Sequence, residues 1–130
     1  MTYDDLNRWV DAYEAAWRSG EGVDRLFTRD ATYRSWPYGE PYTGIDAIKE
    51  FWKKETDEGE AFTMAREIVA VDGDTGVVHL EVEYTAPKQR DYRDLWIVKL
   101  DEAGRCYAFE EWPFWPPGSE GGYAPGPAAG

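Results

Sequence analysis

The chain has few sulfur and imidazole side chains: its 130 residues include one cysteine, Cys106, and one histidine, His79. A single cysteine excludes an internal disulfide, and so few thiol and imidazole ligands exclude an ordinary zinc site. We expect Cys106 to be a small core residue, because His79 gives it no evident base partner. The sequence contains no glycine-rich phosphate loop and no haem motif, so we expect neither a metal nor a cofactor.

Basic residues are also scarce. Lys and Arg number 14 against 26 Asp and Glu, which gives a formal net charge of −12. Nucleic acids and anionic membrane surfaces are polyanions, so this charge argues against both as partners. No apolar run approaches the length of a membrane span, and the first residues, MTYDDLNRW, lack the basic region and apolar core of a secretory signal. We therefore expect a cytoplasmic protein.

Aromatic residues, by contrast, are abundant. They make up 16% of the chain, including seven Trp and nine Tyr, within a total apolar content of 42%. This composition is typical of a folded protein, and the length is that of one domain with a core of its own. The aromatic side chains either form a large core or partly line a pocket for an apolar or ring-shaped ligand.

The chain is organised around a predicted β-hairpin, in which runs at 94–100 and 106–114 flank an acidic, Gly-containing turn at 101–104. Because side chains alternate along a strand, one face of the first run carries Asp94, Trp96, Val98 and Leu100, and one face of the second carries Tyr107, Phe109, Glu111 and Pro113. The other faces of the two runs carry Leu95 and Ile97, and Cys106, Ala108 and Trp112, which would suit a sheet-to-sheet contact in a homodimer. The carboxylates of Asp94 and Glu111 need a physical reason to lie among aromatic residues.

The rest of the chain contains helical spacing first and strand alternation afterwards. The predicted helices span residues 2–18, 22–27 and about 43–56, and the other predicted strands span 31–36, 62–71 and 77–85. This order predicts an α+β fold, in which a curved antiparallel sheet is wrapped on three N-terminal helices as a cone with an internal cavity. The predicted domain covers residues 1–115, and residues 116–130 form a Pro/Gly-rich tail that we expect to be mostly unordered.

Two segments resemble the nuclear transport factor 2-like superfamily, and within it the SnoaL-like domains: AYEAAWRSGEGVDRLFTRDATYRSWPYGEPYTGIDAIKEFW and LWIVKLDEAGRCYAFEEW. The resemblance covers about residues 5–115. The resemblance rests on four features that occur in a fixed order along the chain. They are a Gly-acid pair, a Leu-Phe before Asp30-Ala31-Thr32, Gly44 before an Ala-Ile-x-x-Phe helix, and Asp-x-x-Gly-Arg in the last hairpin. Proteins of this fold include polyketide cyclases, ketosteroid isomerases, epoxide hydrolases, dehydratases and non-catalytic binding modules.

The resemblance implies a ligand in the cone, between the concave face of the sheet and the helices. The polar residues there would be Tyr13, Arg66, Asp94 and Glu111. The other expected ligand-binding residues are Trp17, Tyr33, Ser35, Trp36, Trp52, Met64, Trp96, Tyr107 and Phe109.

Of the three catalytic residues of the ketosteroid isomerases, this sequence keeps one. Tyr13 matches their oxyanion-binding tyrosine, but Ser35 occupies the position of their general base and Trp96 that of their second oxyanion donor. The resemblance therefore does not imply that reaction in that form. The histidine on the last strand of the SnoaL-like cyclases is replaced by Phe109.

Two hypotheses remain open. The first is an enzyme without a cofactor (an isomerase, cyclase, lyase or hydrolase) that acts on a hydrophobic, ring-containing small molecule. Glu111 or Asp94 would be its general base, with a pKa raised by the apolar wall, and Tyr13 would donate a hydrogen bond to a developing oxyanion. Arg66 would orient the acid or hold an anionic group, or would only pair with one of the carboxylates in an internal salt bridge. The second hypothesis is a homodimeric binding module without turnover.

Overall fold

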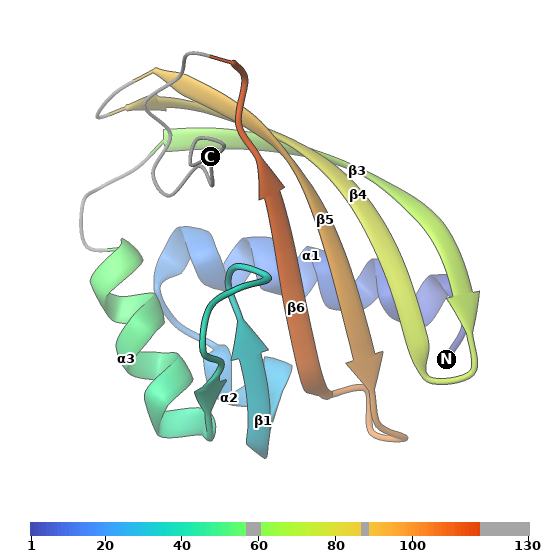
Figure 1. The fold of residues 1–130 in the computed structure, drawn as a ribbon. Helices are drawn as coiled ribbons and strands as arrows, with labels where there is room; N and C mark the ends of the chain where they lie inside the picture. Colours follow the sequence, from blue (N-terminus) through green and yellow to red (C-terminus); the bar gives the residue numbers. More distant parts are fainter. Residues whose placement is uncertain (57–60, 87–88, 118–130) are drawn as a thin grey trace.

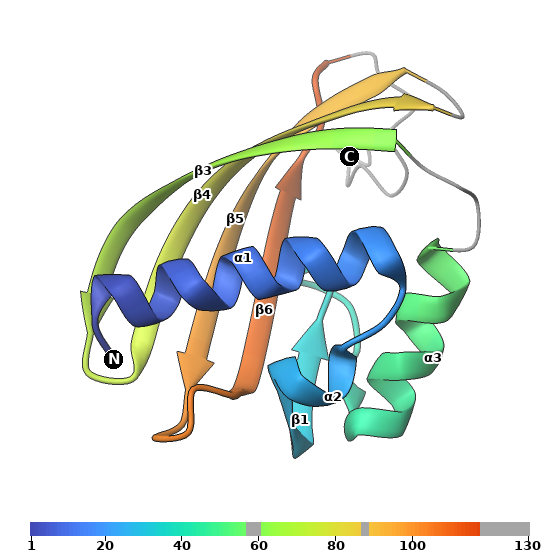
Figure 2. The ribbon, with the colours of Figure 1, turned by 180° about the vertical axis from the view of Figure 1, so that it is seen from behind.

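The computed structural model describes residues 1–56, 61–86 and 89–117, and it confirms the α+β class (Figure 1). Its elements are α1 (Tyr3–Ser19), α2 (Val23–Leu26), β1 (Phe27–Arg34), β2 (Tyr42–Thr43), α3 (Ile45–Thr56), β3 (Ala61–Asp72), β4 (Thr75–Ala86), β5 (Arg90–Leu100) and β6 (Cys106–Phe114). The strands form one curved sheet in the order β2-β1-β6-β5-β4-β3, and α1 runs across its concave side (Figure 2).

The sheet is antiparallel except at one pair. β1 lies parallel to β6, with Tyr33 opposite Phe109 and Arg34 opposite Glu110. The prediction of a purely antiparallel sheet is wrong at this position, because the first strand of the chain is inserted next to the last. This insertion places β1 and the α3 helix that packs on it beside the residues of the C-terminal hairpin.

Local signals fix the long helix α1. The Thr2 side chain accepts a hydrogen bond from the Asp5 backbone N–H, and the Asp5 carboxylate accepts one from the Thr2 backbone N–H, which completes a capping box. Gly20 ends the helix in the left-handed conformation that glycine adopts without strain. The buried face of α1 consists of Leu6, Trp9, Val10, Tyr13 and Ala16. Tyr13 therefore points from the helix toward the sheet.

A close approach of α1 to β4 gives a test of this packing. A Cβ added at Gly76 would lie 2.4 Å from Cδ2 of the fully buried Leu6. We expect Gly76→Ala to lower the free energy of unfolding by about 1–3 kcal/mol, measured by urea denaturation. In a Leu6→Ala background the same change should cost much less, because the clashing methyl group is gone. Equal costs in the two backgrounds would contradict the contact.

A β-bulge changes the register of the C-terminal hairpin. Lys99 pairs with Ala108 and Leu100 with Cys106, so Tyr107 is left as the extra residue. Cys106 and Phe109 consequently both face the core, whereas Tyr107 lies at the surface and its hydroxyl donates a hydrogen bond to Asp74. The predictions that Tyr107 faces inward and Cys106 outward are therefore wrong.

The outer face of the hairpin keeps the rest of its predicted pattern. Leu95, Ile97 and Ala108 are partly buried there, and Trp112 is 37% exposed. The homodimer predicted for this face stays a prediction. The predicted tail, 116–130, lies mostly outside the described residues. In the part of the chain that is described, no helix is long and apolar enough to cross a membrane.

Candidate functional site

A pocket of about 390 Å³ lies between the concave side of the sheet and the helices. Most of its walls are aromatic, and its charged groups come from three different elements. The lining residues are Tyr13, Trp17, Ser35, Tyr42, Phe51, Glu55, Phe62, Met64, Val82, Tyr84, Arg90, Tyr92, Trp96, Glu111 and Trp115. A pocket of this size and lining is typical of small-molecule sites.

The structure places some of the predicted ligand-binding residues in this wall and others behind it. Tyr13, Trp17, Ser35, Met64, Trp96 and Glu111 line the pocket. Tyr33, Trp52 and Phe109 are buried in the core, and the rings of Trp52 and Phe109 lie 4.8 and 5.6 Å from that of Tyr13. These three residues support the wall. Trp36 packs against Tyr38, at a centroid distance of 5.4 Å, and is not among the pocket's described lining residues.

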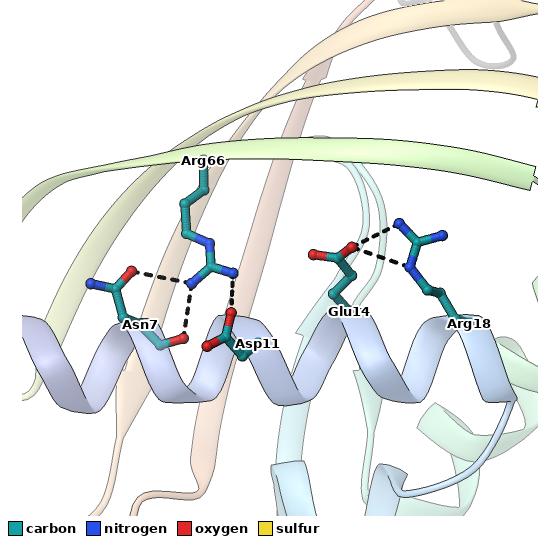
Figure 3. A network of polar contacts seen from close by, with 5 residues as sticks. All are labelled: Asn7, Asp11, Glu14, Arg18 and Arg66. Atoms are coloured by element: carbon teal, nitrogen blue, oxygen red, sulfur yellow. Dashed lines mark hydrogen bonds and ion pairs between the residues drawn. The ribbon is translucent and has the colours of Figure 1, made fainter.

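Arg66 has different partners from the predicted ones (Figure 3). Its Nη1 donates to the backbone oxygen of Asn7 at 3.0 Å and to Asn7 Oδ1 at 3.2 Å, and its Nη2 pairs with Asp11. Arg66 does face the concave side, but the first groups that it meets there belong to α1. The predicted salt bridge to Glu111 or Asp94 is therefore wrong, and Arg66 links β3 to α1. The predicted contact of Arg66 with a ligand stays a prediction.

Two carboxyl groups meet on the inner face of the C-terminal hairpin. Asp94 lies opposite Pro113 and Glu111 opposite Trp96, so the two acids are diagonal neighbours on adjacent strands. Asp94 is 1% exposed, and its Oδ2 accepts a hydrogen bond from Trp96 Nε1 at 2.9 Å. Its Oδ1 has no hydrogen-bond partner among the described residues. Glu111 lies in front of it and reaches the pocket.

This environment changes the proton affinity of both acids. Burial raises the pKa of Asp94 to about 6, against the lowering effect of its contacts with Glu111 and the Trp96 indole. Burial, and then the negative charge of Asp94, raise the pKa of Glu111 well above its usual range. Two close carboxyl groups in an apolar wall cannot both ionise easily, so the pair favours a state in which one of them keeps its proton.

Besides the Glu111 carboxyl group, the pair of tyrosine hydroxyl groups of Tyr13 and Tyr33 supplies a second hydrogen-bond donor. The hydroxyl oxygens of Tyr13 and Tyr33 are 2.7 Å apart, and burial raises the pKa of Tyr13 well above its usual value. The Tyr13 phenol therefore stays neutral. Because a phenol can donate one hydrogen bond and accept another, Tyr13 can accept from Tyr33 and donate to a ligand oxygen in the pocket that it lines.

Several lining residues were not predicted as ligand contacts, and four of them form a series of rings. Trp115 stacks on Tyr92 at 4.5 Å, Tyr92 on Tyr84 at 6.2 Å, and Tyr84 packs on Phe62 at 5.5 Å, which continues the wall from β6 to β3. The Arg90 guanidinium lies 4.9 Å from the centroid of the Tyr84 ring. Arg90 and Tyr92 lie between the predicted strands 77–85 and 94–100, yet they continue the alternation of Asp94 and Trp96 toward the N-terminus, two residues apart. That signal could have found them.

Within the described ranges, no group of three or more His, Cys, Asp or Glu side chains is arranged to hold a metal ion.

Comparisons with known proteins agree with this fold. The chain resembles a steroid delta-isomerase from Pseudomonas aeruginosa, with 21% identity, coverage of 84% of this chain and 79% of that one, and a TM-score of 0.63. An M. tuberculosis LEH-like epoxide hydrolase gives 14% identity, 85% and 83% coverage and a TM-score of 0.70. SalBIII, an epoxide hydrolase/cyclase-like enzyme with a role in pyran ring formation in the polyether salinomycin, gives 19% identity, 85% and 90% coverage and a TM-score of 0.66.

At these identities the likenesses show the fold alone. No curated protein matches the chain in sequence. A family model does match, the SnoaL-like domain, and it covers residues 6–109. The predicted resemblance is thereby confirmed, and the chain belongs to the family of SnoaL-like domains.

Proposed function

We propose that this protein is an acid–base enzyme that binds a hydrophobic, ring-containing small molecule in its aromatic pocket. The observation that carries the proposal is the carboxyl pair, in which Asp94 lies buried behind Glu111 and Glu111 reaches the pocket. A carboxylic acid that keeps its proton at neutral pH is an effective general acid, and a merely solvated surface acid has no such property.

The proposed chemistry follows from where these groups lie. Glu111 gives its proton to an oxygen of the bound molecule as a bond to that oxygen breaks or its charge develops. Tyr13 donates a hydrogen bond to the same region, as oxyanion-stabilising donors do. Aromatic walls exclude water and so strengthen both interactions. Arg90, which also lines the pocket, adds a positive charge near the aromatic series.

The structural neighbours support proton transfer without selecting one reaction. They include a steroid isomerase, an epoxide hydrolase and a cyclase-like enzyme. A shared fold alone does not transfer an activity. We therefore propose the class of chemistry and the class of ligand from the site, and leave the reaction to experiment.

The test is a thermal-shift screen of the purified protein, with product analysis by mass spectrometry. The probes are 5-androstene-3,17-dione, limonene oxide, an anthraquinone and benzoic acid. A ligand present at about 100 times its Kd should stabilise the protein by about 2.7 kcal/mol. Stabilisation together with a new product would support the enzyme. Stabilisation without product from any probe would favour a binding module, and no stabilisation by any probe would contradict a ligand pocket.

A further inference from the structure

The pocket has a third carboxyl group, on a wall formed by a helix. We propose that Glu55 of α3 is a catalytic base that works with Glu111 as the acid, and that the pocket adds water to its substrate or removes water from it. This inference rests on the proposed function, because it needs Glu111 as the proton donor.

The inward face of α3 sets the position of Glu55. Phe51, one turn earlier, lines the same pocket, and Trp52 is 2% exposed with its ring 4.8 Å from those of both Tyr13 and Trp17. Residues three and four apart lie on one helix face, so Glu55 follows these two residues along the side that faces the pocket. It is itself a lining residue, and α3 stands on the concave side of the sheet (Figure 2).

Glu55 differs from Glu111 in its surroundings. It is exposed, and in the described part of the chain its carboxylate takes part in no hydrogen bond or ion pair; the lysine of α3 that does form an ion pair, Lys49, binds Asp24. Its negative charge is close enough to Glu111 to contribute to that residue's raised pKa. The pocket therefore has a carboxyl group with a raised pKa on β6 and an exposed carboxyl group on α3. Burial, and then the negative charge of the neighbouring Asp94, raise the pKa of the Glu111 carboxyl group.

Two such groups on different walls suit a reaction in which one proton is taken and another is given. With an epoxide, Glu55 removes a proton from a water molecule, the water oxygen forms a bond to carbon, and the ring C–O bond breaks. The ring oxygen receives the proton of Glu111, and the product is a diol. The proton gained by Glu55 and the proton lost by Glu111 are then exchanged through solvent, so the enzyme returns to its initial state.

Loss of water from a β-hydroxy ketone uses the same groups. Glu55 removes the proton next to the carbonyl group, the C–OH bond breaks, and Glu111 protonates the leaving hydroxide as water. The product is an unsaturated ketone. An exposed carboxylate is suited to this exchange, because its proton is readily passed to bulk water.

The experiment compares three variants with the wild type on two probes, styrene oxide and 4-hydroxy-4-phenylbutan-2-one. The variants are Glu55→Gln, Glu111→Gln and, as the matched control, Glu50→Gln. Glu50 is another exposed glutamate of α3, and it does not line the pocket among the described residues. We expect Glu55→Gln to lower kcat on the converted probe by about 10²-fold or more, because a positioned base contributes about that factor. Its KM and melting temperature should stay near the wild-type values, and Glu50→Gln should react at the wild-type rate.

Isotope labelling separates a base from a nucleophile. In a single turnover of styrene oxide in ¹⁸O-labelled water, a base places the label in the diol during that first turnover. Transfer of an unlabelled carboxylate oxygen from Glu55 would overturn the proposed role.

Other outcomes separate the inference from the proposed function. If the wild type converts neither probe, the inference about Glu55 is wrong and the proposed role of Glu111 is unaffected. The same conclusion follows if Glu55→Gln reacts like Glu50→Gln while Glu111→Gln loses activity. If neither glutamate matters for a probe that is converted, both proposals fall.

Discussion

Replacement of Glu111 by Gln is expected to lower kcat/KM by about 10²–10⁴-fold on any substrate that the pocket converts, because an amide cannot act as a general acid. Gln has nearly the same size and can still form a hydrogen bond with Asp94, so the wall should keep its shape. The loss should therefore fall mainly on kcat. Steady-state kinetics of the wild type and the variant at pH 7 would measure it.

The neighbouring residue provides the control for this result. Glu110 lies on the other face of β6, where it accepts a hydrogen bond from the Trp112 indole. Glu110→Gln removes one negative charge at almost the same place in the chain but leaves the pocket unchanged. If the two variants turned over substrate at similar rates, Glu111 would have no acid–base role.

The largest expected effect on stability comes from Asp94→Asn. The ordinary pKa of this carboxyl group is 3.8, and burial in the folded protein raises it to about 6. The protonated form is thus favoured by folding. Its contribution to stability is fully present below pH 3.8 and is lost as the pH rises through about 6. The difference between these two pKa values corresponds to about 3 kcal/mol.

Asn does not titrate, so the variant should not lose this stability as the pH rises to neutral. The free energy of unfolding of Asp94→Asn, relative to the wild type, should rise by about 2 kcal/mol between pH 4 and pH 7, as measured by urea denaturation. Asp5 and Asp74, whose pKa values are lowered by hydrogen bonds, respond to pH in the opposite sense. They are present in both proteins and cancel in the comparison. If the free energies of unfolding of the two proteins changed in parallel with pH, ionisation of Asp94 would not destabilise the fold, and the prediction would be wrong.

The fold could be predicted largely from periodic patterns, which are local. The predicted strand 106–114 has the bounds of β6, and the predicted helix 2–18 is displaced by one residue from α1. The parallel pairing of β1 with β6 was not predicted, because contacts between strands far apart in the sequence leave no local pattern.

The placement of the site residues was predictable in part. The pattern of polar groups on an apolar face points to Asp94 and Glu111, and the family resemblance points to Tyr13. The structure places Glu111 and Tyr13 in the wall of one pocket, with Asp94 next to Glu111. Tyr107 was misplaced because a bulge adds one residue and reverses the faces before it, a change that alternation alone cannot show.

Other errors had different causes. Arg66 has the predicted face, but its partners belong to α1, and no pattern within β3 identifies the helix that packs against it. Glu55 lies at helical spacing from the apolar residues Phe51 and Trp52, and an acid within such an apolar stripe is the same kind of signal as Glu111 on an apolar strand face.

The parallel contact between β1 and β6 has a consequence for how the chain acquires its structure. Residues 27–34 have no partner strand on that side until residues 106–114 are available, so closure of the sheet must wait until nearly the whole domain has been synthesised. Contacts of such large sequence separation slow folding, and the unpaired edge meanwhile exposes apolar side chains. We therefore expect the nascent chain to depend on chaperone protection until its last strand emerges from the ribosome.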